Sequence, residues 1–91
     1  MNPAARYPTN LPEYALNLNR AEIQRITILR NNAAQAGADP YYLAVLDTLI
    51  AMNTRMIQVG RQPFSPAGLL EMMNLCTNIR AGWGTLNVYL E

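Results

Sequence analysis

The sequence predicts an all-α protein, a chain of three helices that associates as an antiparallel homodimeric helical bundle. Three observations predict this fold. Apolar residues recur at helical intervals, proline and glycine separate the segments, and 51% of the 91 residues are apolar whereas only 14% are charged. So apolar a chain has enough side chain to form a core. A core of this size commonly completes its burial by self-association.

The first 12 residues are expected to form an extended lead, because proline recurs there and disfavours helix. Residues 13–91 are expected to form a single helical domain. Its first helix is predicted over residues 13–36, with Gly37 as the stop signal. One stripe of this helix is mostly uncharged and polar, which fits either a solvated face or hydrogen bonding to a polar partner. The stripe consists of Asn17, Arg20, Gln24, Thr27, Asn31 and Gln35.

The second helix is predicted over residues 40–59, opened by Asp39 as N-cap and Pro40 as its first residue and ended by Gly60. Its apolar residues cover roughly 200° of the circumference, about twice the stripe that a surface helix needs. We therefore expect a second subunit to bury part of this helix. The expected dimer interface consists of Leu46, Leu49, Ile50 and Ile57.

The remaining narrow face of the second helix carries small and polar residues, among them Thr48 and Arg55. No carboxylate stands three or four residues before Arg55, so its guanidinium is expected to be unpaired and available to an outside anion. The structural alternative is that small residues simply allow close helix packing.

The third helix is predicted over residues 65–81, opened by Ser65 and Pro66. Gly82 and Gly84 weaken it, so the following residues either extend the helix or form an irregular tail. A heptad-like series predicts a core stripe in which Cys76 is a buried small hydrophobe; the series is Leu69, Met72, Cys76, Ile79, Trp83 and Leu86. Four methionines are expected to fill gaps in the core, with an adaptable methionine-lined partner groove as the alternative; they are Met52, Met56, Met72 and Met73.

The composition argues against catalysis. The chain has no histidine, one cysteine and no run of 18 apolar residues, which disfavours a metal centre, nucleophile–histidine chemistry, a disulfide scaffold and a membrane span. We expect no cofactor, no metal and no catalytic residue. All seven cations are arginines and the net charge is only +1, so no strong field draws the chain to nucleic acid. A small binding protein is the expected class.

Three short stretches flank or end the second helix: Ala38-Asp39-Pro40, Asn53-Thr54-Arg55-Met56-Ile57 and Arg61-Gln62-Pro63. A hydroxyl–Arg–Met segment that leads through a proline-containing linker into a third helix resembles the RNA-silencing suppressor of nodaviruses, over residues 38–70. The resemblance implies a viral protein of the host cytoplasm. It also implies a helical hairpin plus a short helix that dimerises antiparallel, lies along double-stranded RNA and shields it from dicing.

The chain departs from that family in three ways. The second helix is shorter, the lysines upstream of the arginine are missing, and the third helix is longer. Only Arg55 therefore carries over as an RNA contact. Further contacts are inferred from the polar faces: Arg20, Gln24, Asn31 and Thr48. A-form RNA is recognised largely by shape through phosphates and 2′-hydroxyls, which these side chains suit.

Two functions from different classes follow. The first is a non-catalytic double-stranded RNA-binding protein, a viral suppressor of RNA silencing that acts as a homodimer. The alternative is a small helical protein-binding module of phage or bacterial origin, an inhibitor or adaptor of the anti-CRISPR kind, whose partner is a host or phage-target protein. Neither interpretation involves a membrane.

Overall fold

The computed structural model describes residues 8–90, and all regular structure in that range is α-helical. Helix α2 spans Glu13–Gln35, α3 spans Pro40–Arg61 and α4 spans Pro66–Leu90. The prediction of an all-α chain with three helices is confirmed. Residues 8–12 precede α2 without forming a helix, whereas residues 1–7 of the expected lead and Glu91 lie outside the described residues.

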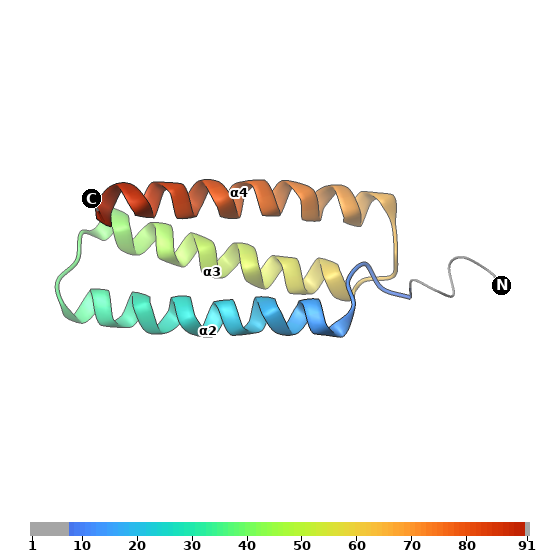
Figure 1. Ribbon diagram of the computed structural model, residues 1–91, viewed down its shortest axis with the longest axis horizontal. Coiled ribbons are helices and arrows are strands. Elements are labelled where there is room, and N and C mark those ends of the chain that lie inside the picture. The colour runs from blue at the N-terminus through green and yellow to red at the C-terminus, as the bar shows by residue number, and fades with distance from the viewer. Residues whose placement is uncertain (1–7, 91) are drawn as a thin grey trace.

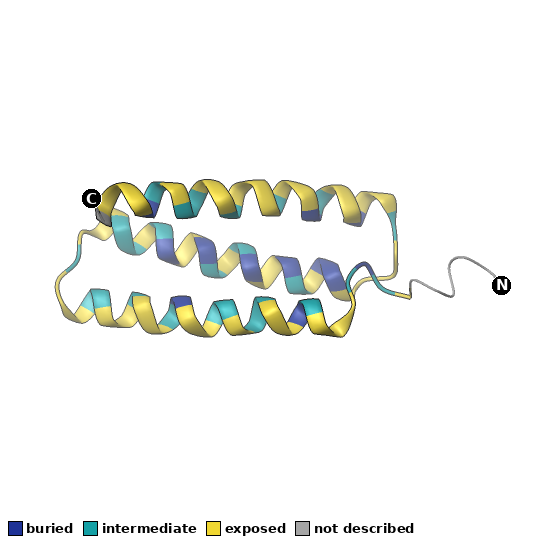
Figure 2. Cartoon of the chain, viewed as in Figure 1, coloured by how far each residue is buried: buried dark blue, intermediate teal, exposed yellow. Residues whose placement is uncertain are grey.

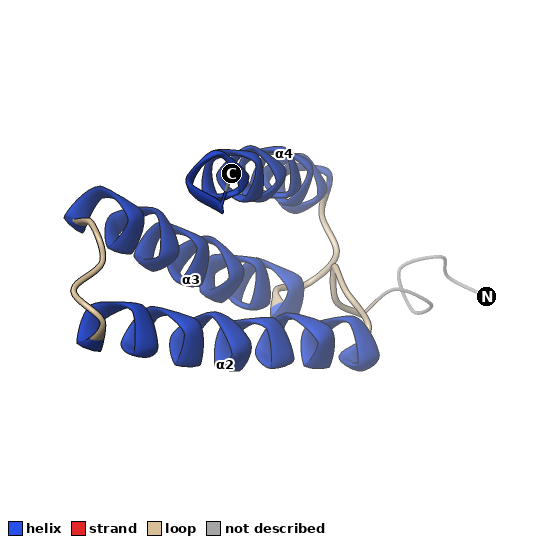
Figure 3. Cartoon of the chain, turned by 60° about the vertical axis from the view of Figure 1, so that its left-hand side comes forward, coloured by secondary structure: helices blue, strands red, loops and turns tan. Residues whose placement is uncertain are grey.

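The helices lie side by side with α3 in the middle (Figure 1). Each of α2 and α4 packs against α3, and the two have no close backbone approach to each other. Helices α2 and α4 run in the same direction, opposite to α3. A turned view shows α4 and α2 diverging on the two sides of α3 (Figure 3). The space between α2 and α4 is therefore open on the side away from α3.

The core follows the buried side of α3, where most of the buried residues gather (Figure 2). One cluster joins all three helices and consists of Ile26, Leu46, Leu49 and Leu86. A second cluster lies nearer the end of α3 and consists of Met56, Val59 and Met72. Because α3 contributes to both clusters, it is the element on which the other two helices depend for burial.

The predicted start signals act as expected. The backbone N–H of Tyr41 donates to Asp39 Oδ1 at 2.7 Å, so Asp39 caps α3, and the N–H of Gly68 donates to Ser65 Oγ at 3.0 Å, so Ser65 caps α4. Gly37 has a φ of +77°, the left-handed conformation that favours glycine after a helix. These local contacts confirm the segmentation.

Glycine proved a poor stop signal in the other helices. Helix α3 continues through Gly60 to Arg61, and a Cβ on Gly60 would lie only 2.7 Å from Leu16 Cδ2. Helix α4 continues through both of its glycines to Leu90, and a Cβ on Gly82 would lie 2.7 Å from Leu49 Cδ2. The residues that follow Gly84 therefore extend the helix and do not form an irregular tail. At Gly60 and Gly82 the glycine allows close packing instead of ending the helix.

Asn10 ties the segment before α2 to the connection between α3 and α4. Its side-chain Nδ2 donates to the carbonyl of Val59 at 2.9 Å, and its Oδ1 accepts from the N–H of Ser65 at 2.9 Å. Its backbone N–H donates to the carbonyl of Gln62 at 3.0 Å. The buried Asn10 amide therefore holds three segments together at one end of the molecule.

Two of the four residues expected in the dimer interface are buried within the single chain. Leu46 and Leu49 are already 0% exposed in the single chain, because Ile26 and Leu86 cover them. Ile50 is half-buried against the same cluster, and Ile57 is half-buried. The broad apolar face of α3 is covered by two helices of its own chain, one on each flank, and this burial does not require a second subunit.

The expected core stripe of the third helix is partly wrong. Met72 and Leu86 are buried, and Ile79 and Trp83 are partly buried against the core, but Leu69 and Cys76 are exposed. Met73, which was expected to fill a gap in the core, is 66% exposed. The reason is that α4 packs closely against α3 alone, and α3 covers one side of α4. The flank of α4 that looks toward α2 is left open.

Candidate functional site

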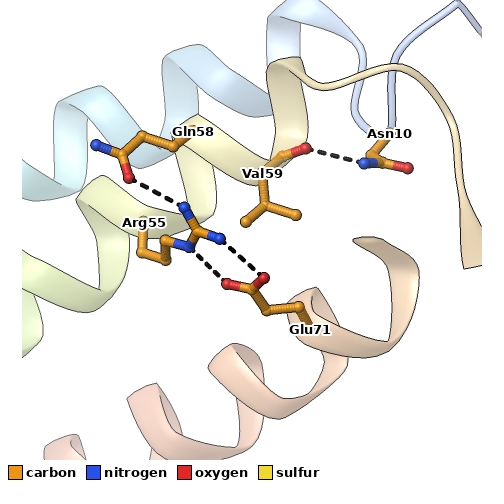
Figure 4. A network of polar contacts seen from close by, with 5 residues as sticks. All are labelled: Asn10, Arg55, Gln58, Val59 and Glu71. Atoms are coloured by element: carbon orange, nitrogen blue, oxygen red, sulfur yellow. Dashed lines mark hydrogen bonds and ion pairs between the residues drawn. The ribbon is translucent and has the colours of Figure 1, made fainter. Parts of the chain in front are cut away.

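Arg55 is held by a carboxylate from another helix. Its Nε donates to Glu71 Oε2 at 2.6 Å and its Nη2 donates to Glu71 Oε1 at 3.0 Å, while Nη1 reaches Gln58 Oε1 at 3.5 Å (Figure 4). The hydrogen bond from Arg55 lowers the pKa of the Glu71 carboxyl, and the same contact raises the pKa of Arg55. The expectation that Arg55 is unpaired is therefore wrong. Glu71 lies 16 residues further along the chain, on α4, where helical spacing within α3 does not reveal it.

Three other arginines are paired in the same way. Arg20 binds Glu13 at 3.0 Å and also Asn17, Arg25 binds Glu22 at 2.6 Å, and Arg30 of α2 binds Asp47 of α3 at 3.0 Å. In the described part of the chain, Arg61 and Arg80 are the cations without an ion pair. Four of the six arginines within residues 8–90 therefore have a carboxylate partner.

The remaining residues expected to contact RNA do not gather into one cluster. Gln24 and Asn31 are exposed on α2. Thr48 is exposed on α3, and its hydroxyl donates to the carbonyl of Ala44 at 2.8 Å, within its own helix. No hydrogen bond or ion pair among residues 8–90 connects the α2 residues of the expected RNA site to Thr48 or Arg55. Three of the five residues lie on α2 and two lie on α3.

A different feature stands out on the open side of the fold. A hollow of about 440 Å³ lies between α2 and α4 with α3 as its floor. Its walls include Leu18 from α2 and Cys76 and Ile79 from α4, and its floor includes Asn53 and Met56 from α3. A second hollow of about 350 Å³ is lined by residues of α2, including Leu29, and by Trp83 of α4. We call these two hollows together the α2–α4 groove.

The α2 wall of the α2–α4 groove exposes large apolar side chains, and the α4 wall exposes Cys76. On α2, Leu18 is 68% exposed and Leu29 is 39% exposed. On α4, Cys76 is exposed, whereas Met72 is 6% exposed and belongs to the buried core. Two methionines, Met56 and Met72, line the groove, as in the alternative interpretation of a methionine-lined surface.

The polar groups of the groove floor already have partners. Asn53 is 2% exposed, its Nδ2 donates to the carbonyl of Leu49 at 2.9 Å, and its Oδ1 accepts from Asn19 Nδ2 at 3.1 Å. Arg80, at the rim, is the charged residue of the first hollow. The groove is therefore a largely neutral, apolar surface that needs no polar ligand to satisfy its floor.

A hollow of about 460 Å³ on the other flank of α4 is less suited to recognition. Small residues are frequent in its lining, including Ala44, Ala81 and Gly82, and Tyr41 is its exposed large apolar side chain. Close packing between α3 and α4 accounts for this pattern, since Gly82 stands directly over Leu49. We therefore take the α2–α4 groove as the candidate site.

Comparison of the chain with protein-family models, with curated proteins and with solved structures found no match. Within residues 8–90, no helix combines the length and apolar composition needed to cross a bilayer. The same residues hold no group of three or more His, Cys, Asp or Glu side chains arranged to bind a metal ion. The residues of the α2–α4 groove are therefore the basis for the functional inference.

Proposed function

We propose that the protein is a non-catalytic protein-interaction module that binds an amphipathic helix in its α2–α4 groove. The observation that carries this proposal is the pair of exposed apolar walls, with Leu18 on one side and Cys76 on the other, above a buried floor. Contiguous exposed apolar surface of this kind marks interaction sites in soluble proteins. This is the protein-binding alternative of the sequence analysis.

The geometry of the groove suits a helix because it lies between two helices that run in the same direction. A fourth helix laid antiparallel to both would complete a four-helix bundle at ordinary interhelical distances of about 8–10 Å. Its anchoring side chains would repeat at helical spacing and fill the two hollows. Met56 and Met72 adapt readily to the shape of such side chains.

Duplex-RNA binding and the suppression of RNA silencing stay predictions, but the ion pairs favour the protein-binding function. A phosphate that binds Arg55 would have to compete with the bidentate contact from Glu71, and one that binds Arg20 would compete with Glu13. Counterion release from free cations supplies most of the affinity of proteins for nucleic acid. Paired arginines contribute less to that release.

The experiment pans a displayed library of helical peptides against the folded chain at nanomolar concentration. Enriched peptides are expected to lose at least tenfold in affinity when Leu18→Glu places a charge in the wall of the groove. Ala81→Glu, an exposed change on the other flank of α4, is the control and is expected to leave affinity unchanged. Failure to enrich any peptide whose binding depends on Leu18 would overturn the proposal.

A gel shift with duplex RNA, duplex DNA and single-stranded RNA decides the competing function. The protein-binding proposal expects no discrete shift with any of the three. A shift with duplex RNA that falls at least tenfold in Arg55→Gln, but not in Arg80→Gln, would support the RNA function instead.

A further inference from the structure

We propose that the helix that fills the α2–α4 groove is α4 of a second copy of this chain, antiparallel to the first α4 about a two-fold axis near Cys76. This inference rests on the proposed function, because it names the occupant of the same groove. It differs from the dimer expected from the sequence, in which the second helix formed the contact.

The surface of α4 lacks the charge of a helix that faces water. Its 25 residues include two charged side chains, and Glu71 is already bound by Arg55, which leaves Arg80 as the free charge. The exposed apolar side chains of this helix are Leu69, Leu70, Met73 and Val88, together with exposed Cys76, whereas the partly exposed Tyr89 ring contacts Tyr41 and Tyr42 of α3. Helices at a protein surface ordinarily carry polar and charged residues on the face away from the core. The exposed face of α4 therefore resembles a contact surface.

The scarcity of charged side chains on this surface indicates which kind of partner it can bind. A partner that brought several charges to the groove would leave them desolvated and unpaired, since Arg80 is the one charged side chain there that is free to form an ion pair. A second copy brings the same largely apolar surface, with Arg80 as its one free charge, and no uncompensated carboxylate. The charge pattern thus favours self-association over a strongly charged partner.

A ridge and a groove stand next to each other on the same chain. Met72, Cys76 and Arg80 line the α2–α4 groove, and the same three residues line a further hollow of about 490 Å³ on the outer side of α4, beside Leu69 and Met73. In a two-fold dimer, each copy presents the same patch to the other. The ridge of α4 from each copy then enters the groove of the other, so that one interface covers both features.

The spacing along α4 gives the register. Leu69, Cys76 and Trp83 are seven residues apart and lie on one face of the helix. Cys76 is the midpoint, so an antiparallel two-fold axis places Leu69 against Trp83 of the partner subunit and brings the two Cys76 side chains together. The two Arg80 residues are then separated by eight residues of helix, about 12 Å. This exceeds the screening length of about 8 Å at physiological salt, so their repulsion is weak.

The first test is oxidative cross-linking through Cys76, which is the one cysteine of the chain. A disulfide forms when the two Cα atoms lie within about 4.4–6.8 Å, so we expect most of the wild-type chain to become a covalent dimer. The matched control is Cys76→Ser combined with Met73→Cys. In the antiparallel register the two residues at position 73 are six residues apart along the axis, about 9 Å. They should therefore cross-link at least tenfold more slowly. Equal or faster cross-linking at position 73 would overturn the antiparallel register.

The second test is light scattering at micromolar concentrations, where the wild type is expected to have twice the 10.2 kDa mass of the chain. Met73→Glu, at a side chain that is 66% exposed in the single chain, should raise the dimer dissociation constant at least tenfold without lowering the melting temperature of the diluted monomer. Ala81→Glu should leave the dissociation constant unchanged. A monomeric wild type would overturn this inference, and it would leave the proposed function standing if displayed peptides still bound in a Leu18-dependent manner. If the wild type were monomeric and no displayed peptide bound in a Leu18-dependent manner, both this inference and the proposed function would be wrong.

Discussion

The two glycines within the C-terminal half of α4 offer a matched test of how closely this helix approaches α3. Alanine in place of a helical glycine gains about 0.8–1 kcal/mol of helix propensity. A Cβ on Gly84 meets no atom within 4 Å, so Gly84→Ala keeps this gain. A Cβ on Gly82 would lie 2.7 Å from Leu49 Cδ2 and 3.2 Å from Leu49 Cγ. Gly82→Ala is therefore expected to lose the gain.

The size of the loss follows from the burial of Leu49. This side chain is 0% exposed and belongs to the cluster that joins all three helices, so its shift disturbs several neighbours. Overpacking of a core typically costs about 1–3 kcal/mol. The gain in propensity offsets part of this cost, which leaves Gly82→Ala between neutral and about 2 kcal/mol destabilised. The two variants are expected to differ by at least about 1 kcal/mol.

Urea unfolding and thermal melting followed by circular dichroism measure this difference. In a chain of this size, 1 kcal/mol changes the melting temperature by about 4–8 °C. Gly84→Ala should melt above the wild type and Gly82→Ala at or below it. In a Leu49→Ala background, which itself costs about 2–5 kcal/mol, the penalty of Gly82→Ala should disappear because the clashing atoms are gone. Equal stabilisation by both alanines in the wild-type background would refute the close approach of α4 to α3.

Three further predictions concern stability. Asn10→Ala removes the hydrogen bonds to Val59 and Ser65 and should cost about 1–3 kcal/mol in urea unfolding; an effect below about 0.5 kcal/mol, typical of a surface change, would contradict its role. Asp39→Ala removes the cap on α3 and should cost about 0.5–2 kcal/mol, whereas an unchanged urea midpoint would show that the cap is not needed. Arg55 lowers the pKa of Glu71, so this ion pair contributes stability above the ordinary glutamate pKa and loses it as the pH falls through the depressed value. The stability difference between wild type and Glu71→Gln should accordingly shrink below about pH 4, and a difference that stays constant from neutral to acid pH would argue against the pair.

The helices themselves were predictable because their signals are local. Asp39 with Pro40 and Ser65 with Pro66 mark helix starts through hydrogen bonds that span only two or three residues. Glycine misled the prediction of two helix ends. The same residue type permits a left-handed turn at Gly37 and a close helix contact at Gly82, and only the neighbours in space distinguish the two uses.

The candidate site was not predictable in the same way. The sequence pattern predicted an unpaired Arg55 and a buried Cys76. In the structure Arg55 is bound by Glu71 from another helix and Cys76 is exposed, so both predictions were wrong. A heptad series shows that residues share a face of a helix, but it does not show whether another helix covers that face. The exposed Leu18 was one apolar residue among several on the first helix, without a signal that it borders a groove.

The sequence by itself determined the all-α class, the number of helices and the places where they begin, because these depend on capping and periodicity within a few residues. The tertiary structure decided which faces are buried. Helix α3 lies between its two neighbours and buries Leu46 and Leu49, while the divergence of α2 and α4 opens the groove beside Cys76. The physical reason is that burial and ion pairing depend on the relative position of whole helices, which arises from contacts between residues far apart in the chain.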